Sequence, residues 1–201
     1  MGRALIIVDY QNDFAAPDGA LAVPGGEAIA ARINELAASG GLAVVVATRD
    51  WHPPDHGSFV TVRPDAPWPV HCVAGSPGAQ LHPALDCELV DVVLDKGTDP
   101  ATEGYSAFDG TGLADLLRER GADELLIVGL ATDYCVKHTA LDGLAEGFAV
   151  TVDLDGVRAV DLRPGDGDRA LDEIRAAGAV AARDPRDENA DRHGRRDTTR
   201  Q

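Results

Sequence analysis

The stretch ALIIVD, residues 4–9, contains five consecutive apolar residues and ends on an aspartate. An apolar run this short and continuous is typical of a β-strand that is buried on both faces, as in parallel sheets. The chain therefore predicts a first strand here and five later ones, at residues 42–48, 90–94, 125–128, 148–154 and 179–182.

Segments with apolar residues at helical spacing separate these strands. In the first of them, Ile29, Ile33 and Leu36 recur every three to four residues before Gly40 ends the pattern. Strands that alternate with helices predict an α/β protein, with a single-domain, open, mostly parallel six-stranded sheet and helices on both faces. The predicted helices span about residues 27–39, 111–120, 134–146 and 167–177.

The length of 201 residues is typical of one domain. Almost no apolar residues follow residue 183, so we expect a folded domain over 1–183 and a disordered tail over 184–201. The formal net charge is −16, and because acidic and basic residues cancel in the tail, all of it falls on the domain. A field of this sign repels phosphate backbones and anionic lipids, which argues against nucleic-acid and membrane partners.

Three cysteines, Cys72, Cys87 and Cys135, cannot all pair within one chain. The sequence shows no charged-then-apolar leader and no run of 18 apolar residues. We therefore expect a reduced, cytoplasmic protein in which at least one cysteine serves chemistry. The sequence leaves both a monomer and a homo-oligomer open.

Reactive side chains follow four of the predicted strands. Ligands bind beyond the carboxyl ends of parallel strands, and those ends carry Asp9, Asp50, Lys96 and Cys135. A helix start near Cys135 lowers the pKa of a thiol, and the N–H groups of such a turn can hold an oxyanion. Lys96 is one of two lysines against sixteen arginines, and a buried amine can tune nearby pKa values. Each residue alone could serve packing, capping or solvation, but their convergence favours catalysis.

Asp50, His52, His56 and His71 form a second group. An Asp-x-His pair on an extended segment directs two side chains to the same side, and further imidazoles complete a mixed nitrogen and oxygen set. Such a set suits Fe, Mn, Zn, Co or Ni, and it differs from thiolate-rich structural zinc sites. We therefore predict a metal site, and we interpret as structural or surface residues Cys72, Cys87, His82, Lys137 and His138.

Two long segments, residues 51–86 and 97–110, lack any periodicity. Connections of this length inside a compact domain are usually functional. The predicted core strands are aliphatic, whereas most aromatic residues lie in the loops after the first three strands. This distribution predicts a flat, apolar pocket for a small ring. The loop aromatics are Phe14, Trp51, Phe59, Trp68, Tyr105 and Phe108.

Six motifs together resemble those of the nicotinamidase/pyrazinamidase enzymes, which belong to the isochorismatase-like cysteine hydrolases. The resemblance is collinear over about residues 1–182. The motifs are VDYQNDF at 8–14, TRDWHP at 48–53, WPVHC at 68–72, KG at 96–97, YSAF at 105–108 and GLATDYCV at 129–136.

The resemblance implies roles for the residues already singled out. It implies a catalytic triad of Asp9, Lys96 and Cys135, and an oxyanion hole formed by the N–H groups of Ala131, which follows a cis peptide, and Cys135. It implies one divalent metal ion, Zn, Fe or Mn, with four ligands to consider: Asp50, His52, His71 and, as the doubtful fourth, His56. The residues implied to bind the substrate are Phe14, Leu21, Trp68, Tyr105 and Tyr134.

The implied reaction converts nicotinamide to nicotinate and ammonia through a thioester on Cys135, in NAD salvage, and extends to pyrazinamide. One alternative is another cysteine amidohydrolase of the superfamily, acting on an N-carbamoyl compound, ureidoacrylate or a cyclic amide. A second alternative is a non-catalytic module that binds a metal or small ligand. The simultaneous presence of the cysteine and the metal set favours nicotinamidase.

Overall fold

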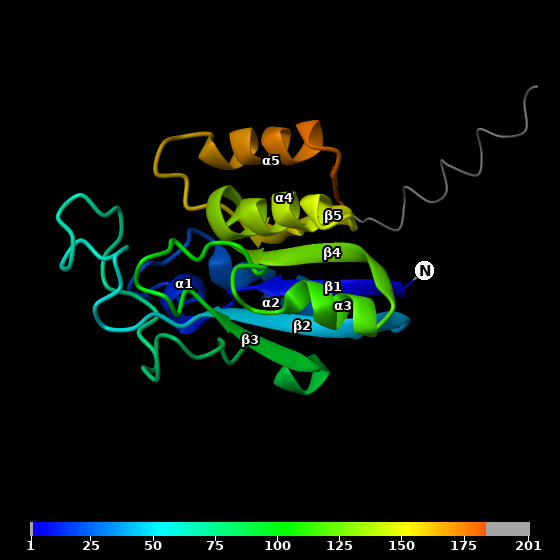
Figure 1. The fold of residues 1–201 in the computed structure, drawn as a ribbon, viewed down its shortest axis with the longest axis horizontal. Coiled ribbons are helices and arrows are strands. Elements are labelled where there is room, and N and C mark those ends of the chain that lie inside the picture. The colour runs from blue at the N-terminus through cyan, green and yellow to red at the C-terminus, as the bar shows by residue number, and fades with distance from the viewer. Residues whose placement is uncertain (1, 184–201) are drawn as a thin grey trace, which may run out of the picture.

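The computed structural model describes residues 2–183, which form a six-stranded sheet flanked by helices (Figure 1). Every strand pair in the sheet is parallel, and the strand order is β3-β2-β1-β4-β5-β6. The predicted open six-stranded α/β sheet is confirmed, and it is wholly rather than mostly parallel. The strands are β1 (Gly2–Val8), β2 (Leu42–Asp50), β3 (Val92–Lys96), β4 (Ala122–Leu130), β5 (Ala149–Arg158) and β6 (Val180–Ala182).

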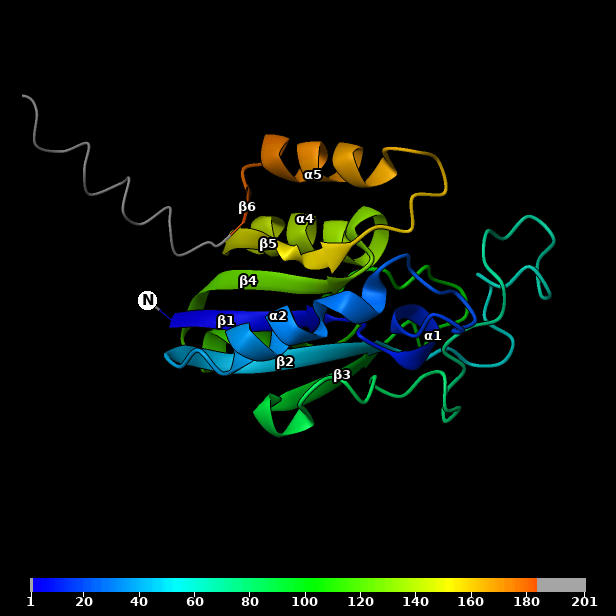
Figure 2. The same ribbon diagram turned by 180° about the vertical axis from the view of Figure 1, so that it is seen from behind.

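Helices cover both faces of the sheet, as predicted. Figure 1 shows α3 and α4 in front of the sheet, and the reverse view in Figure 2 shows α1 and α2 on the opposite side. The α-helices are α1 (Asn12–Ala15), α2 (Ala30–Ala37), α3 (Leu113–Glu119), α4 (Lys137–Ala145) and α5 (Asp166–Ala176). Shorter helical turns are η1 (Gly26–Ile29), η2 (Cys87–Leu89) and η3 (Thr132–Val136), of which η3 is a π-helical turn.

The continuous apolar run of β1 is explained by the two cores that it separates. Ile6 and Val8 pack into the core beneath α3, α4 and α5, whereas Leu5 and Ile7 pack into the core beneath α1 and α2. All four side chains are fully buried. Because strand side chains alternate between faces, a strand between two helical layers must be apolar at every position.

Some predicted boundaries were wrong by a few residues. The third strand was predicted at 90–94 but runs from Val92 to Lys96, because its pairing with β2 continues to the Asp50–Lys96 pair. The helix predicted over 27–39 divides into η1 and α2. The segment that forms α1 was predicted as loop, since four residues are too few for a helical period.

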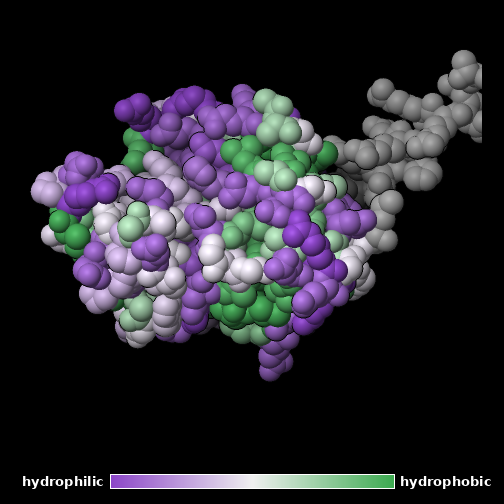
Figure 3. Space-filling view, in the orientation of Figure 1, coloured by the Kyte–Doolittle hydropathy of each residue, from purple (hydrophilic) through white to green (hydrophobic). Residues whose placement is uncertain are grey.

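The long loops after β1, β2 and β3 gather beyond the carboxyl end of the sheet, on the left of Figure 1. Hydrophilic residues cover most of the surface in that view, and its hydrophobic surface is divided into separate patches (Figure 3). No helix within residues 2–183 is long and apolar enough to cross a membrane. The tail predicted over 184–201 lies outside the described residues, so the domain boundary stays a prediction.

Candidate active site

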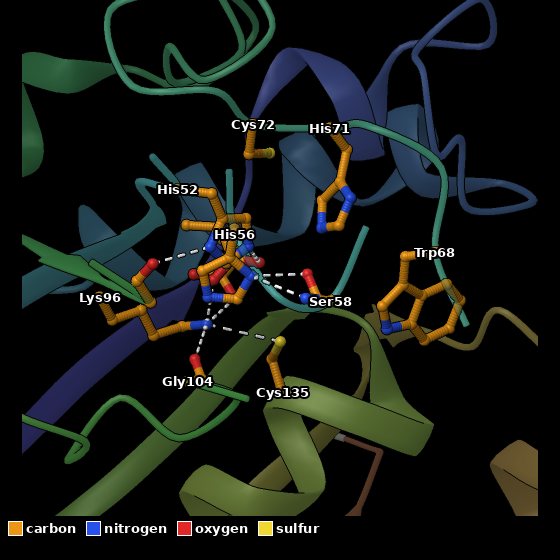
Figure 4. A network of polar contacts seen from close by, with 12 residues as sticks. His52, His56, Ser58, Trp68, His71, Cys72, Lys96, Gly104 and Cys135 are labelled. Atoms are coloured by element: carbon orange, nitrogen blue, oxygen red, sulfur yellow. Dashed lines mark hydrogen bonds and ion pairs between the residues drawn. The ribbon is translucent and has the colours of Figure 1, made fainter. Parts of the chain in front are cut away.

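Lys96 connects the groups at the ends of three neighbouring strands. Its Nζ lies 2.8 Å from Asp9 Oδ2 and 2.5 Å from Asp50 Oδ1, and it donates a hydrogen bond of 2.9 Å to the Gly104 carbonyl. The same amine lies 3.5 Å from Cys135 Sγ (Figure 4). The register explains the contact with Asp50, since Asp50 and Lys96 are paired residues at the ends of β2 and β3. The structure therefore brings together the residues predicted as the triad.

Asp9 is held at the end of β1 by a neighbouring strand. The Thr48 hydroxyl of β2 donates a hydrogen bond of 2.7 Å to Asp9 Oδ1 and accepts one of 3.2 Å from the Asp9 N–H. Asp9 adopts a φ of +48°, a left-handed conformation that is uncommon outside glycine. The carboxylate is fully buried against Lys96, so its position is determined from both sides.

The pKa values of the two carboxyl groups around Lys96 shift in opposite directions. Burial raises the pKa of Asp9 to about 6, and the Lys96 charge only partly opposes this rise. Burial would also raise the pKa of Asp50 and lower that of Lys96, but their mutual attraction prevails, so the pKa of Asp50 falls and the pKa of Lys96 rises well above its usual value. The site thus holds a firm Asp50–Lys96 ion pair beside a carboxyl group that can exchange a proton near neutrality.

The expectation that a helix start lowers the thiol pKa of Cys135 was wrong for this site. Burial raises the pKa of Cys135 well above its usual value, and the attraction of Lys96 does not compensate. The nearby Asp9 and Asp50 charges act in the same direction as burial. Cys135 is therefore a neutral thiol that needs a base, and an Asp9 oxygen lies within 4.8 Å of its sulfur.

Cys135 lies in η3, directly after the end of β4. The Leu130–Ala131 peptide is cis, as the resemblance implied. The Ala131 carbonyl accepts hydrogen bonds of 3.1 Å from the N–H groups of Tyr134 and Val136. This turn places the backbone of Ala131 and the thiol of Cys135 on the wall of one cavity.

Asp50, His52 and His71 offer three ligand atoms that all lie within 4.8 Å of one another. The Nδ1 atoms of His52 and His71 each lie 2.8 Å from a backbone carbonyl, those of Gly97 and Pro69. A carbonyl only accepts, so these Nδ1 atoms carry protons, and Nε2 is the atom that each ring can offer to a cation. Carbonyls that orient ligand imidazoles in this way are typical of metal sites. The donor set therefore fits a divalent cation.

His56 packs against His52 but is not part of the cluster of Asp50, His52 and His71. The ring centroids of His56 and His52 are 4.0 Å apart, and His56 Nδ1 lies 2.7 Å from Ser58 Oγ. His56 Nε2 is buried and has no hydrogen-bond partner within residues 2–183. A buried nitrogen without a partner is costly, and a cation would satisfy it. The structure thus supports His56 as a candidate ligand and leaves its role a prediction.

A small cavity lies between the two clusters. Asp50, His71 and Cys135 all reach its wall, so a molecule inside it contacts the metal ligands and the thiol together. All five residues implied to bind the substrate line this cavity. These five residues are Phe14, Leu21, Trp68, Tyr105 and Tyr134. The remaining lining residues are Val23, Leu130, Ala131 and Val160.

Three of these aromatics support one another. Trp68 Nε1 donates a hydrogen bond of 3.0 Å to the Tyr105 hydroxyl, and the Trp68 ring meets Tyr134 edge-on at 4.8 Å. His138, interpreted from sequence as structural, stacks on Tyr105 with centroids 5.2 Å apart. The aromatic wall is therefore held in place before any ligand enters.

The other loop aromatics do not line this cavity. Phe59 packs edge-on against His52 and also contacts the other two imidazoles. Trp51 lies under the guanidinium of Arg49, and Phe108 stacks on Phe148 in the core. None of these three was among the residues implied to bind the substrate, and their loop positions alone do not give the directions of their side chains.

Val160 was not singled out from sequence. It follows β5, and its N–H donates a hydrogen bond of 2.9 Å to Asp133 Oδ1 in η3. The Asp161 N–H donates to the other oxygen of the same carboxylate, also at 2.9 Å. An isolated valine after a strand carries no sequence signal. In the folded chain the Asp133 carboxylate holds its backbone beside the cavity.

Known proteins are similar to this chain in both sequence and fold. The isochorismatase domain model matches residues 3–184. The nicotinamidase of Escherichia coli (strain K12) is 46% identical over 200 residues, which covers 89% of this chain and 93% of the relative. The pyrazinamidase of Pyrococcus horikoshii, solved in complex with zinc, is 43% identical with a TM-score of 0.82, over 91% of this chain and 99% of that one.

An L. infantum protein solved in complex with nicotinate is 41% identical to this chain, with a TM-score of 0.85. The match covers 90% of this chain and 92% of that one. The domain model, the sequence identities and the shared sheet agree along nearly the whole chain, and the chain therefore belongs to the isochorismatase family.

Proposed function

We propose that this protein is a metal-dependent cysteine amidohydrolase that converts nicotinamide to nicotinate and ammonia, in NAD salvage. The observation that carries the proposal is the meeting of two clusters at one small aromatic-walled cavity. One contains Cys135 with Lys96 and Asp9, and the other is the donor set of Asp50 and the histidines. The nicotinamidase of E. coli and the zinc-bound pyrazinamidase of P. horikoshii support both the substrate class and the metal.

The cavity favours a flat, neutral, heteroaromatic amide. Phe14, Trp68, Tyr105 and Tyr134 surround the ring, and the carboxamide faces Cys135. A divalent ion held by Asp50, His52 and His71, with His56 as the candidate fourth ligand, would supply a Lewis-acid contact for the ring nitrogen. Pyrazinamide offers the same ring nitrogen and amide, so we propose it as a second substrate.

Asp9 acts as the proton carrier. It takes the proton of the neutral Cys135 thiol as the sulfur attacks the carboxamide carbon, and Lys96 stabilises the resulting charges. The N–H groups of Ala131 and Cys135 hold the oxyanion of the tetrahedral adduct. Asp9 then returns the proton to the leaving nitrogen, and ammonia departs to leave a thioester on Cys135.

Water completes the cycle. Asp9, again a carboxylate, takes one proton from the attacking water, and the thioester carbon–sulfur bond breaks to release nicotinic acid, which loses its remaining proton to solvent as nicotinate. The sulfur recovers the proton as a thiol. One group thus serves both half-reactions, which requires a carboxyl pKa near the working pH, and the value of about 6 for Asp9 meets that requirement.

An ammonia-release assay on nicotinamide, with metal analysis of the same sample, tests the proposal. We expect turnover of nicotinamide and pyrazinamide together with bound divalent metal. Turnover of an N-carbamoyl compound without any ammonia from nicotinamide would favour another amidohydrolase of the superfamily. No ammonia from any amide of such a panel would indicate a binding module.

The pH dependence should show the titration of Asp9. Because the pKa of Asp9 is about 6, we expect kcat/KM to fall about tenfold per pH unit below about pH 6, as the protonated carboxyl can no longer accept the thiol proton. Initial rates between pH 4.5 and 8, on metal-loaded protein, measure the profile. A flat profile down to pH 5 would exclude Asp9 as the base.

Removal of the metal should inactivate the enzyme. Metal polarisation and orientation contribute several kcal/mol, so we expect chelation to lower kcat/KM by about 100-fold or more. Added Zn, Mn or Fe should restore the rate, and comparison of the three identifies the preferred metal. A fully active metal-free protein would contradict the metal assignment.

His56→Ala tests the fourth ligand. Loss of a ligand nitrogen should weaken zinc binding about tenfold or more and lower the rate, since the buried Nε2 then no longer meets the cation. Competition with a chromophoric chelator measures the affinity. Unchanged metal content and unchanged rate would reduce His56 to a residue at the edge of the cavity.

A further inference from the structure

The turn after β1 and the first turn of α1 carry two polar side chains that the reaction does not use. Gln11 and Asp13 lie on either side of Asn12, and neither belongs to the described lining of the cavity. The Gln11 N–H donates a hydrogen bond of 2.8 Å to the Asp9 carbonyl, so this turn begins at the catalytic base itself. Gln11 points instead to Asp50 at the end of β2, and Asp13 points to Cys72, which follows His71 in the connection between β2 and β3.

Gln11 holds the main chain of Asp50 from both sides. Its Oε1 accepts the Asp50 N–H at 2.8 Å, and its Nε2 donates to the Asp50 carbonyl at 2.8 Å and to the Ala79 carbonyl at 2.9 Å. The Gln11 side chain is fully buried, so water cannot replace these bonds. Hydrogen bonds to both the N–H and the carbonyl of Asp50 restrain its φ and ψ. They therefore also restrain the direction of the Asp50 carboxylate.

Asp13 holds the residue after His71. Its Oδ2 accepts the Cys72 N–H at 2.7 Å. Cys72 has a φ of +44°, a backbone angle that residues other than glycine rarely adopt. The Cys72 carbonyl in turn accepts the His52 N–H at 3.0 Å. The Asp13 carboxylate therefore stabilises a strained residue whose two peptide groups connect it to both histidine donors.

The loop over residues 76–80 closes this arrangement from outside. The N–H groups of Asn12 and Asp13 donate to the carbonyls of Gln80 and Gly78, each at 3.0 Å. A Cβ on Gly78 would lie 2.2 Å from Asp13 Oδ2, so only glycine lets the loop approach so closely. The positions of Gln11 and Asp13 are thus determined by several independent contacts.

We propose that Gln11 and Asp13, together the 11–13 bracket, are positioning residues that set the geometry of the Asp50, His52 and His71 donors. This inference rests on the metal site of the proposed function. The bracket does not line the cavity and acts only through the main chain around the donors, at Asp50 and at Cys72. Loss of outer partners of metal ligands typically weakens metal binding about 10–100-fold, and we expect an effect of that size.

Gln11→Met and Asp13→Ala test the bracket, with Asn12→Ala as the matched control. Methionine keeps the length of Gln11 but none of its hydrogen bonds. Asn12 is the first residue of α1 and donates 2.8 Å to the Pro77 carbonyl, but within the described residues its side chain forms no hydrogen bond to Asp50, to the two histidine donors or to Cys72. The probes are Zn²⁺ affinity, by chelator competition, and the visible spectrum of the Co²⁺-loaded protein, which reports coordination geometry.

We expect Zn²⁺ affinity to fall about 10–100-fold in Gln11→Met and Asp13→Ala and the Co²⁺ bands to shift, with Asn12→Ala like the wild type. Asp13→Asn should recover most of the affinity, because an amide oxygen can still accept the Cys72 N–H. Should Gln11→Met fail to fold, the Asp13 pair decides alone.

Wild-type affinity and an unchanged Co²⁺ spectrum in folded Gln11→Met and Asp13→Ala would overturn the bracket, even if their melting temperatures fell. The proposed function fails separately, when the wild-type protein binds Zn²⁺ but releases no ammonia from nicotinamide. The affinity measurements need no substrate, so the two failures are distinguishable.

Discussion

Cys135→Ala is expected to lower kcat/KM for nicotinamide by about 10⁴-fold or more, because removal of the nucleophile of a covalent mechanism typically has an effect of this size. The substitution removes one sulfur from the cavity wall and leaves the metal donors and the aromatic wall in place. Nicotinamide binding should therefore persist. Ammonia release measures the loss, and titration calorimetry on the zinc-loaded variant measures the binding.

Cys87→Ala is the matched control, since the Cys87 thiol is exposed and η2 lies away from the cavity lining. It should retain the wild-type rate, and a thiol-specific reagent should still inactivate it through Cys135. Turnover by Cys135→Ala at a rate near that of the wild type would show that another group attacks the carboxamide.

Lys96→Met should both inactivate and destabilise the protein. Removal of the amine leaves Asp9 and Asp50 buried side by side without their cation, and breaking a buried pair costs about 3–5 kcal/mol. One carboxyl group then takes up a proton, so Asp9 no longer serves as a base at neutral pH. Urea unfolding measures the free energy, and ammonia release measures the activity.

Lys137→Met is the control, because Lys137 is the other lysine of the chain. It pairs with Glu173 at 3.1 Å where the glutamate is more than half exposed, so its loss should cost no more than about 1 kcal/mol. The double variant Asp9→Asn with Lys96→Met should regain part of the stability and none of the activity. Equal effects of Lys96→Met and Lys137→Met on unfolding would mean that the buried cluster is not the ion pair described above.

The convergence of the reactive residues was predictable from sequence for a simple reason. Each of Asp9, Asp50 and Lys96 ends an apolar run, and in a parallel sheet all such ends lie on one edge. Cys135 follows the fourth run by a short turn and reaches the same edge. Strand ends therefore identified the cluster without any knowledge of loop structure.

Loop residues were predictable only in part. The histidines after β2 were recognised by their number and ligand chemistry, yet nothing in their spacing shows that the rings of His56 and His52 lie against each other. The loop aromatic residues divide between the cavity wall, the histidine cluster and the hydrophobic cores. Val160 comes from the far end of the chain, held by the Asp133 carboxylate. Loop directions depend on contacts between distant segments, which no local pattern contains.

The sequence by itself determined the sheet, its buried strands and the chemical identity of the groups at their ends, because hydrophobic periodicity and residue type are local properties. The tertiary structure alone decided the proton chemistry. The pKa of Asp9 near 6, the neutral thiol of Cys135 and the firm Asp50–Lys96 pair all follow from burial and from distances of a few ångströms between different strands. Electrostatic energies depend on those distances and on the exclusion of water, and both exist only after the chain has folded.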